Sequence, residues 1–182
     1  MQIHFIRHGQ SIFNEIFNRD GIDPGITDAP LTQIGKQQAQ EAKQKLDQID
    51  VEMVITSPLS RAIETTQIIF PEHRLIRIDP RIREVLNHSC DIGRGPEVLR
   101  NEFPALDFGN LSKIWWYDGR IDHRGIPVEP NESLISRAED FVTEIKILRL
   151  KNLAIVSHGN FINHIINRQL QNCEIAVFSF FQ

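Results

Sequence analysis

The chain has 182 residues, of which 41% are hydrophobic and 24% charged, so it can bury a substantial core and has a globular balance. The 20 Lys and Arg against 24 Asp and Glu give a formal net charge of -4, which argues against binding of nucleic acid through a basic surface. No apolar run approaches the ~18 residues that span a bilayer, and the N-terminus does not read as a signal peptide. With only two cysteines and no disulfide framework, we expect a soluble protein of the cytoplasm, without a membrane partner.

Short apolar runs and helical patterns alternate along the chain. Runs typical of buried strands occur at residues 3–6, 51–56, 74–78, 153–157 and 174–180. Helix-period patterns occur at about 32–46, 59–70, 131–148 and 161–166, and a short helix is expected after Pro96. This alternation predicts an α/β fold, a three-layer α/β/α sandwich around a mainly parallel sheet. We expect a single domain over residues 1–182, with an irregular, lid-like excursion at about 79–130.

Basic side chains follow three of the expected strands. Arg7 and His8 end the first, Arg61 lies shortly after the second, and His158 follows the run at 153–157. Ser57 and Pro58 resemble an N-cap and the first residue of the helix that carries Arg61. Because the carboxyl ends of parallel strands meet at one edge of a sheet, these side chains are expected in one crevice.

Such a cluster suits a phosphoryl group. Guanidinium groups bind phosphate through paired hydrogen bonds, and neighbouring positive charge keeps an imidazole neutral and nucleophilic. A neutral imidazole can attack phosphorus and form a phosphohistidine, which divides one difficult displacement into two easier ones. This scheme needs no metal or cofactor, and the seven histidines show no paired metal-ligand spacing.

A general acid must protonate the departing oxygen. Glu84 is the candidate, because it follows the run at 74–78 and opens the irregular segment. Spacing alone leaves Asp91, Glu97 and Glu132 open as alternatives.

Several segments match one known family in order. They are Arg7-His8-Gly9-Gln10-Ser11 with Asn14, Asp28-Ala29-Pro30-Leu31-Thr32 with Gly35, Ser57-Pro58-Leu59-Ser60-Arg61-Ala62, Asn131-Glu132-Ser133 with Arg137 and Phe141, and Ser157-His158-Gly159. The chain resembles the histidine phosphatase superfamily, also called phosphoglycerate-mutase-like proteins. The resemblance implies that His8 accepts the phosphoryl group, that Arg7, Arg61 and His158 complete the pocket, that Asn14 contacts phosphate and that Glu84 donates the proton. Gln10, Ser11 and Gly159, within the matching segments, are further candidates for phosphate binding.

The predicted function is hydrolysis of a small phosphorylated metabolite. A phosphoglycerate mutase is the first alternative, since it uses the same phosphohistidine. Residues 85–88 do not resemble the corresponding mutase loop, and the chain stops soon after its last expected strand. Cys90-Asp91-Ile92-Gly93 and Trp115-Trp116 resemble a less characterised, mutase-like branch. A non-catalytic module that binds a phosphorylated ligand is the second alternative, and the oligomeric state is left open.

Overall fold

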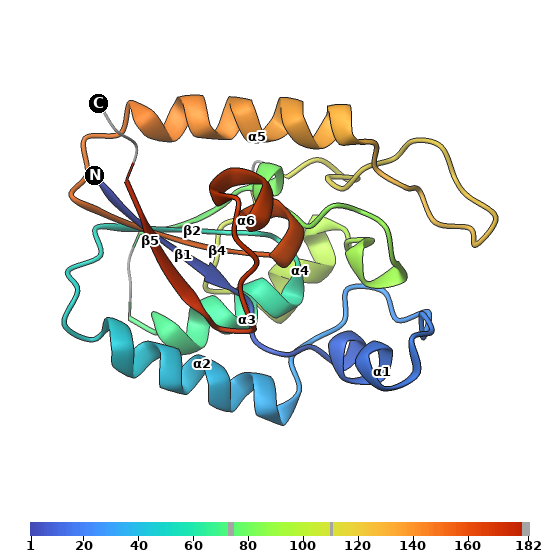
Figure 1. Ribbon diagram of the computed structural model, residues 1–182, viewed down its shortest axis with the longest axis horizontal. Helices are drawn as coiled ribbons and strands as arrows, with labels where there is room; N and C mark the ends of the chain where they lie inside the picture. Colours follow the sequence, from blue (N-terminus) through green and yellow to red (C-terminus); the bar gives the residue numbers. More distant parts are fainter. Residues whose placement is uncertain (73–74, 110, 180–182) are drawn as a thin grey trace.

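The computed structural model describes residues 1–72, 75–109 and 111–179 and contains a five-stranded sheet (Figure 1). The strands are β1 (Gln2–Arg7), β2 (Met53–Thr56), β3 (Ile76–Ile78), β4 (Asn152–Ser157) and β5 (Ile175–Phe178). Their order in the sheet is β3-β2-β4-β1-β5, and only β5 runs antiparallel to its neighbour. The predicted α/β fold with a mainly parallel sheet is therefore confirmed. Arg74 and Phe180, at the ends of two expected strands, lie outside the described residues.

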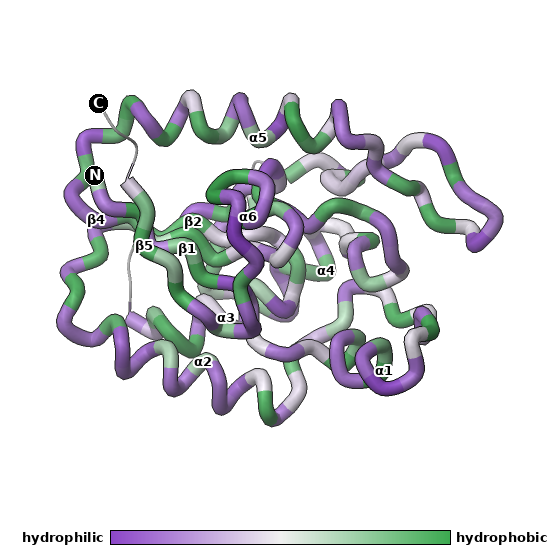
Figure 2. The backbone as a smooth tube through the Cα atoms, viewed as in Figure 1, coloured by the Kyte–Doolittle hydropathy of each residue, from purple (hydrophilic) through white to green (hydrophobic). Residues whose placement is uncertain are grey.

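Helices cover both faces of this sheet. They are α1 (Ile12–Asp20), α2 (Gln33–Leu46), α3 (Ser60–Ile69), α4 (Pro96–Glu102), α5 (Asn131–Lys146) and α6 (Gly159–Ile166). In Figure 1, α5 and α6 lie on one side of the strands, and α2 and α3 lie on the other. The hydrophobic residues concentrate in the central strands, whereas the long outer helices alternate hydrophilic and hydrophobic residues (Figure 2). No helix among the described residues is both long and apolar enough to cross a membrane.

Alternate residues of the strands supply two separate cores. Ile3 and Phe5 of β1 pack with the apolar residues of α5 and α6, such as Phe141 and Phe161. Ile6, next along the same strand, packs in the other cluster with alanines of α2 and α3. A strand that is buried on both faces reads as a continuous apolar run, which explains why these strands are recognisable in the sequence.

The start of α3 differs from the expectation. Leu59, and not Ser57, is the N-cap, and the helix begins at Ser60. Asp28 accepts hydrogen bonds from the backbone N–H of Ser60 (2.7 Å) and from its hydroxyl (2.6 Å). A carboxylate from a distant loop therefore satisfies the first turn of the helix, and the local Ser-Pro pair does not.

The segment between β3 and α5 consists mostly of turns and loops. It contains two 3-10 turns, Pro80–Ile82 and Ser89–Asp91, besides α4. Leu99, Phe103, Phe108 and Trp115 from this segment pack against α3 in a third apolar cluster. The residues that lead into α5 project beyond the rest of the molecule (Figure 1).

Candidate active site

The first candidate histidine lies beside the second at the carboxyl edge of the sheet. His8 follows β1 and His158 follows β4, and these two strands are neighbours in the sheet. The two imidazole rings are 5.0 Å apart between centroids, and both residues are buried. The sheet topology therefore brings together two histidines that are 150 residues apart in sequence, as the order of elements predicts.

Two hydrogen bonds determine the tautomer of His8. Nδ1 lies 2.7 Å from the carbonyl oxygen of Gly9, which can only accept, so Nδ1 carries the proton. The Nε–H of Arg61 donates to Nε2 of His8 over 3.2 Å, so Nε2 presents its lone pair. Burial, together with the positive charges of Arg61 and Arg7, holds the pKa of His8 well below its usual range. The ring is thus neutral, with its nucleophilic nitrogen directed at a guanidinium.

Arg61 is held by the irregular segment. Its Nη1 donates to the carbonyl oxygen of Cys90 (2.7 Å) and its Nη2 to the carboxylate of Asp91 (3.0 Å). The carboxylate of Asp91 also accepts the backbone N–H groups of Asn87 (3.2 Å) and His88 (3.0 Å). Asp91, named from the sequence as an alternative acid, is instead the ion-pair partner of Arg61.

His158 and Arg7 have unused donors or acceptors at this edge. Both ring nitrogens of His158, and Nε of Arg7, are buried and have no hydrogen-bond partner among the described residues. Burial, followed by the charge of Arg61, lowers the pKa of His158 well below its usual range. Nη1 of Arg7 donates to the carbonyl oxygen of Leu170 over 2.7 Å. A Cβ atom on Gly159 would lie 3.4 Å from Nε of Arg7, in ordinary van der Waals contact with the guanidinium.

The carboxyl group of Glu84 lies at the start of α6, the helix whose N-cap is His158. Its Oε1 accepts the backbone N–H of Val85 (2.9 Å) and Phe161 (3.2 Å), and its Oε2 accepts that of Asn160 (3.2 Å). Burial and the nearby charge of Asp91 raise the pKa of Glu84, although the backbone hydrogen bonds oppose this shift. A carboxyl group with a raised pKa, near the charges of Arg7 and Arg61, can carry and release a proton.

A buried arginine holds the backbone that carries Glu84. Arg137 of α5 donates from Nη1 to the carbonyl oxygens of Arg81 (2.5 Å) and Arg83 (2.9 Å), and from Nη2 to that of Glu84 (3.4 Å). It also pairs with Glu129 through two hydrogen bonds, of 2.9 and 3.0 Å. Burial would raise the pKa of Glu129, but Arg137 and Arg83 hold it below its usual range. In the sequence, Arg137 stands out only as part of the family motif, and no local pattern identifies Glu129 as its partner.

Three further candidates have structural contacts. Ser11 accepts the backbone N–H of Asn14, and Asn14 accepts that of Ser11, both over 3.2 Å, so the pair caps α1. The side chain of Gln10 accepts the hydroxyl of Thr32 (2.8 Å). Asn172, which the sequence gave no reason to select, donates to the carbonyl oxygen of His8 (2.9 Å) and to Oδ1 of Asn14 (3.4 Å).

The arrangement is suited to an anion that accepts many hydrogen bonds. Two guanidiniums and two imidazoles converge at the carboxyl edge, and several of their nitrogens have no partner among the described residues. Unpaired buried donors carry a free-energy cost that a bound oxyanion would remove. Neutral Nε2 of His8 can attack phosphorus, the cations can stabilise the equatorial oxygens, and Glu84 can supply a proton. Among the described residues, no group of three His, Cys, Asp or Glu could hold a metal ion.

Comparison with known proteins finds relatives that are named phosphatases or phosphoglycerate mutases. Residues 3–180 match the model of the histidine phosphatase superfamily (branch 1). A Schizosaccharomyces pombe protein named a probable phosphatase is 27% identical over 178 residues, which cover 86% of this chain and 73% of that protein. The 2,3-bisphosphoglycerate-dependent phosphoglycerate mutase 1 of Arabidopsis thaliana is 38% identical over 188 residues, which cover 88% of this chain but 55% of the mutase.

A solved structure shares the fold. The α-ribazole phosphatase from Shigella flexneri superposes with a TM-score of 0.69 at 23% identity, covering 100% of this chain and 92% of that one. At this identity the likeness concerns the fold, which is that of the phosphoglycerate-mutase-like histidine phosphatases.

Proposed function

Because the chain belongs to the histidine phosphatase superfamily, we propose that it hydrolyses a small phosphorylated metabolite through a phosphohistidine on His8. The observation that carries the proposal is the state of His8. Its Nδ1 proton is directed at the carbonyl oxygen of Gly9 and its Nε2 lone pair at Arg61, so the nucleophilic nitrogen is unprotonated and faces a cation.

In the first step, Nε2 of His8 attacks phosphorus and the bond from phosphorus to the leaving oxygen breaks. The electron pair of that bond stays on the oxygen, which takes the proton of Glu84 and departs as an alcohol. Oε2 of Glu84 accepts one backbone hydrogen bond, whereas Oε1 accepts two, so Oε2 has the lone pair to hold this proton. Because Nε2 then bonds phosphorus, the Nε–H of Arg61 becomes free for a phosphoryl oxygen.

In the second step, Glu84 acts in the opposite sense. Its carboxylate accepts a proton from a water molecule as the water oxygen attacks phosphorus. The bond between Nε2 and phosphorus breaks, its electron pair returns to His8, and inorganic phosphate leaves. His158 and Arg7, with their unpartnered nitrogens, would bind the phosphoryl oxygens in both steps.

Isomerisation of a phosphoglycerate is the second candidate function. The Arabidopsis thaliana mutase is 38% identical to this chain, which favours that reaction, but the chain spans only 55% of its length. A mutase returns the phosphoryl group to the sugar acid, so the two functions differ only in what accepts it from His8.

Phosphate release from a panel of phosphorylated metabolites tests the proposal. The panel contains sugar phosphates, phosphoserine, nucleoside monophosphates, 3-phosphoglycerate and p-nitrophenyl phosphate. His8→Ala is the control variant, with its fold verified by circular dichroism, and we expect it to lose at least ~10³-fold in kcat. Rapid quenching with a ³²P-labelled substrate is expected to trap an acid-labile label on the wild-type chain.

Three results would overturn the proposal. Release that persists in His8→Ala would remove His8 as the nucleophile. Conversion of 3-phosphoglycerate to its isomer, without net release, would identify a mutase. Tight binding of a phosphorylated ligand by folded wild-type protein, with neither release nor labelling across the panel, would indicate a binding module.

A further inference from the structure

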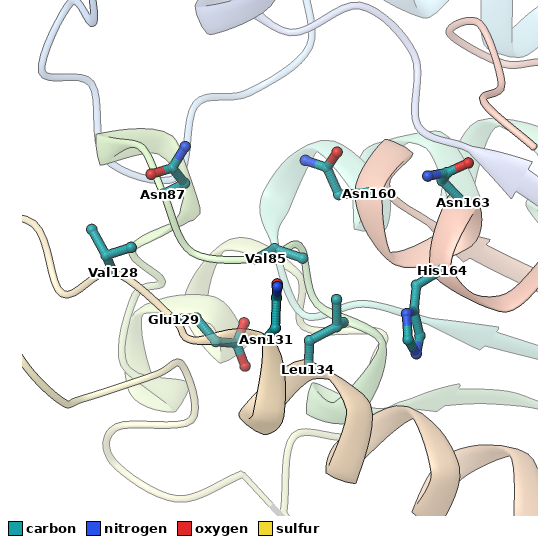
Figure 3. Close-up of a pocket in the computed structure, with 9 residues that line it drawn as sticks. All are labelled: Val85, Asn87, Val128, Glu129, Asn131, Leu134, Asn160, Asn163 and His164. Carbon is teal, nitrogen blue, oxygen red and sulfur yellow. The ribbon is translucent and has the colours of Figure 1, made fainter. Parts of the chain in front are cut away.

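A cavity of about 470 Å³ lies between the first turns of α5 and α6 and the loop that follows Glu84 (Figure 3). This volume is in the range of small-molecule sites, roughly 300–1,000 Å³. Figure 3 shows side chains of the loop, of α5 and of α6 around the same space. The residues that line it include Val85, Asn87, Asn131, Leu134, Asn160 and Asn163.

The cavity lies at the same end of the sheet as the candidate active site. Helix α5 runs into β4 and α6 leaves it, so the first turns of both helices lie at the carboxyl edge. The wall of the cavity is continuous with the candidate acid, because Val85 follows Glu84 and the N–H of Asn160 donates to Oε2 of Glu84. The oxygen atom that Glu84 protonates belongs to the leaving group, so the leaving group must lie within reach of this carboxyl.

The polar lining consists mainly of side-chain amides. Asn87 comes from the loop, Asn131 from α5, and Asn160 and Asn163 from α6. An amide offers both donors and an acceptor, which is what hydroxyl groups require of their partners. Val85 and Leu134 supply an apolar surface for the carbon skeleton that carries those hydroxyls.

One imidazole, that of His164, lies in the wall of the cavity. No lysine or arginine is among the residues that line it in the part of the chain the structure describes. Arg124 reaches the carbonyl oxygen of Asn87 (2.9 Å), but it is paired with Asp122 (2.7 Å). The carboxylate of Glu129, also in the wall, pairs with Arg83 and Arg137, and neither guanidinium group lines the cavity. A carboxylate or second phosphate would therefore lose its hydration here without direct contact to a guanidinium or ammonium group of the described residues.

We infer that this cavity binds the leaving group of the substrate and selects an uncharged, hydroxyl-bearing group, such as a sugar or polyol, over an anionic one. The inference rests on the proposed function and specifies its substrate class. It also bears on the alternative function, because a phosphoglycerate carries a carboxylate, and no lysine or arginine of the described residues lines the cavity to pair with it.

The test compares kcat/KM for ribose 5-phosphate, 3-phosphoglycerate and p-nitrophenyl phosphate. We expect the wild-type protein to prefer ribose 5-phosphate to 3-phosphoglycerate by at least ~10-fold. Asn163→Leu removes one amide, so the ratio of ribose 5-phosphate to p-nitrophenyl phosphate should fall by ~3–10-fold. Asn163→Lys adds a cation, so the preference should shift toward 3-phosphoglycerate by ~10-fold or more.

Asn101→Lys is the matched control, because Asn101 is exposed on α4 and does not line the cavity. It adds the same charge, and its substrate ratios should equal those of the wild type. Should Asn163→Leu fail to fold, Asn131→Leu on the facing helix gives the same measurement. Unchanged ratios in folded variants, or an equal response from Asn101→Lys, would overturn the leaving-group site while leaving the phosphatase intact. Absence of p-nitrophenyl phosphate turnover by the wild type would instead count against the proposed function.

Discussion

The Nε–H group of Arg61 lies 3.2 Å from Nε2 of His8 and donates to its lone pair. Arg61 is kept in this position by the carbonyl oxygen of Cys90 and the carboxylate of Asp91. A protonated Nε2 would point its hydrogen at a guanidinium, which can only donate. The contact thus excludes protonation of His8 at this nitrogen as long as the three groups keep their places.

The first prediction is that His8 stays neutral below the pH at which an ordinary histidine, with a pKa of ~6.5, is half protonated. Burial and the charges of Arg61 and Arg7 lower its pKa, so the neutral form persists as the pH falls below that value. Long-range ¹H–¹⁵N spectra of the imidazoles, recorded between about pH 5 and 8, should show a protonated Nδ1 and a bare Nε2. Titration of His8 with a midpoint near 6.5, or a proton on Nε2, would contradict the structure.

Glu84→Gln should slow the reaction with alkyl phosphates far more than the reaction with p-nitrophenyl phosphate. An alkoxide needs a proton to depart, whereas p-nitrophenolate does not, so we expect kcat/KM, which reports the phosphorylation step, to fall by ~10²–10⁴-fold for the alkyl substrate and much less for the aryl one. Because burial and Asp91 raise the pKa of Glu84, wild-type activity on alkyl phosphates should persist above the ordinary carboxyl range and fall as the pH rises through the raised pKa. That descending limb should vanish in Glu84→Gln.

Glu132→Gln serves as the control for Glu84→Gln. Glu132 is an exposed carboxylate in the first turn of α5 and was an alternative acid on sequence grounds. If it is Glu132→Gln that shows the leaving-group dependence, Glu84 is not the acid.

Arg137→Met should lower kcat/KM for alkyl phosphates by ~10-fold or more, with a smaller effect on kcat/KM for p-nitrophenyl phosphate. Arg137 binds three carbonyl oxygens of residues 81–84 and therefore positions Glu84 without touching substrate. A displacement of about 1 Å in a reacting group can reduce rates by ~10²-fold. Arg137→Lys, which keeps a charge and a donor, should restore part of the rate.

Glu144→Gln is the matched comparison for Arg137→Met. Glu144 also lies on α5 and pairs with Arg77 and Arg81, but it is partly exposed and contacts no backbone of Glu84. A merely structural role for Arg137 predicts equal losses on both substrates, and that pattern would exclude its action through Glu84.

The strands that lead to His8 and His158 could be predicted because their local sequence already shows how they pack in the folded protein. The apolar runs before His8 and His158 pack on both faces, so their strand character is visible without knowledge of their neighbours. Parallel pairing of β1 with β4 then follows from the alternation of strands and helices, and with it the proximity of the two histidines. The proximity of these side chains at one edge of the sheet was accordingly predictable from the order of the elements.

The features that the sequence did not predict depend on contacts between residues far apart in the chain. The start of α3 is set by Asp28, which accepts two hydrogen bonds from Ser60, a contact that no local pattern encodes. Arg94 joins the same group and ties the irregular segment to α3 (2.7 Å to Asp28). The ion pair between Asp91 and Arg61 is of the same kind. In an irregular segment without periodicity, such long-range contacts determine the conformation. The positions of Asp91 and Glu84 in the sequence could therefore not show which of the two is the acid.

Gly9→Ala should reduce the free energy of unfolding by ~1–3 kcal/mol, the usual cost of forcing an extra carbon into a packed site. A Cβ atom on Gly9 would lie 2.5 Å from the carbonyl oxygen of Gly35, and a backbone atom cannot rotate away as a side chain can. Because His8 directly precedes Gly9, kcat should fall as well. Gly95→Ala is the control: the nearest atom to its Cβ would be 4.0 Å away, so its cost is limited to the preference at the N-cap of α4, below ~1 kcal/mol. Urea unfolding of the three proteins measures both values, and equal stabilities of Gly9→Ala and the wild type would show that β1 and α2 are not packed this closely.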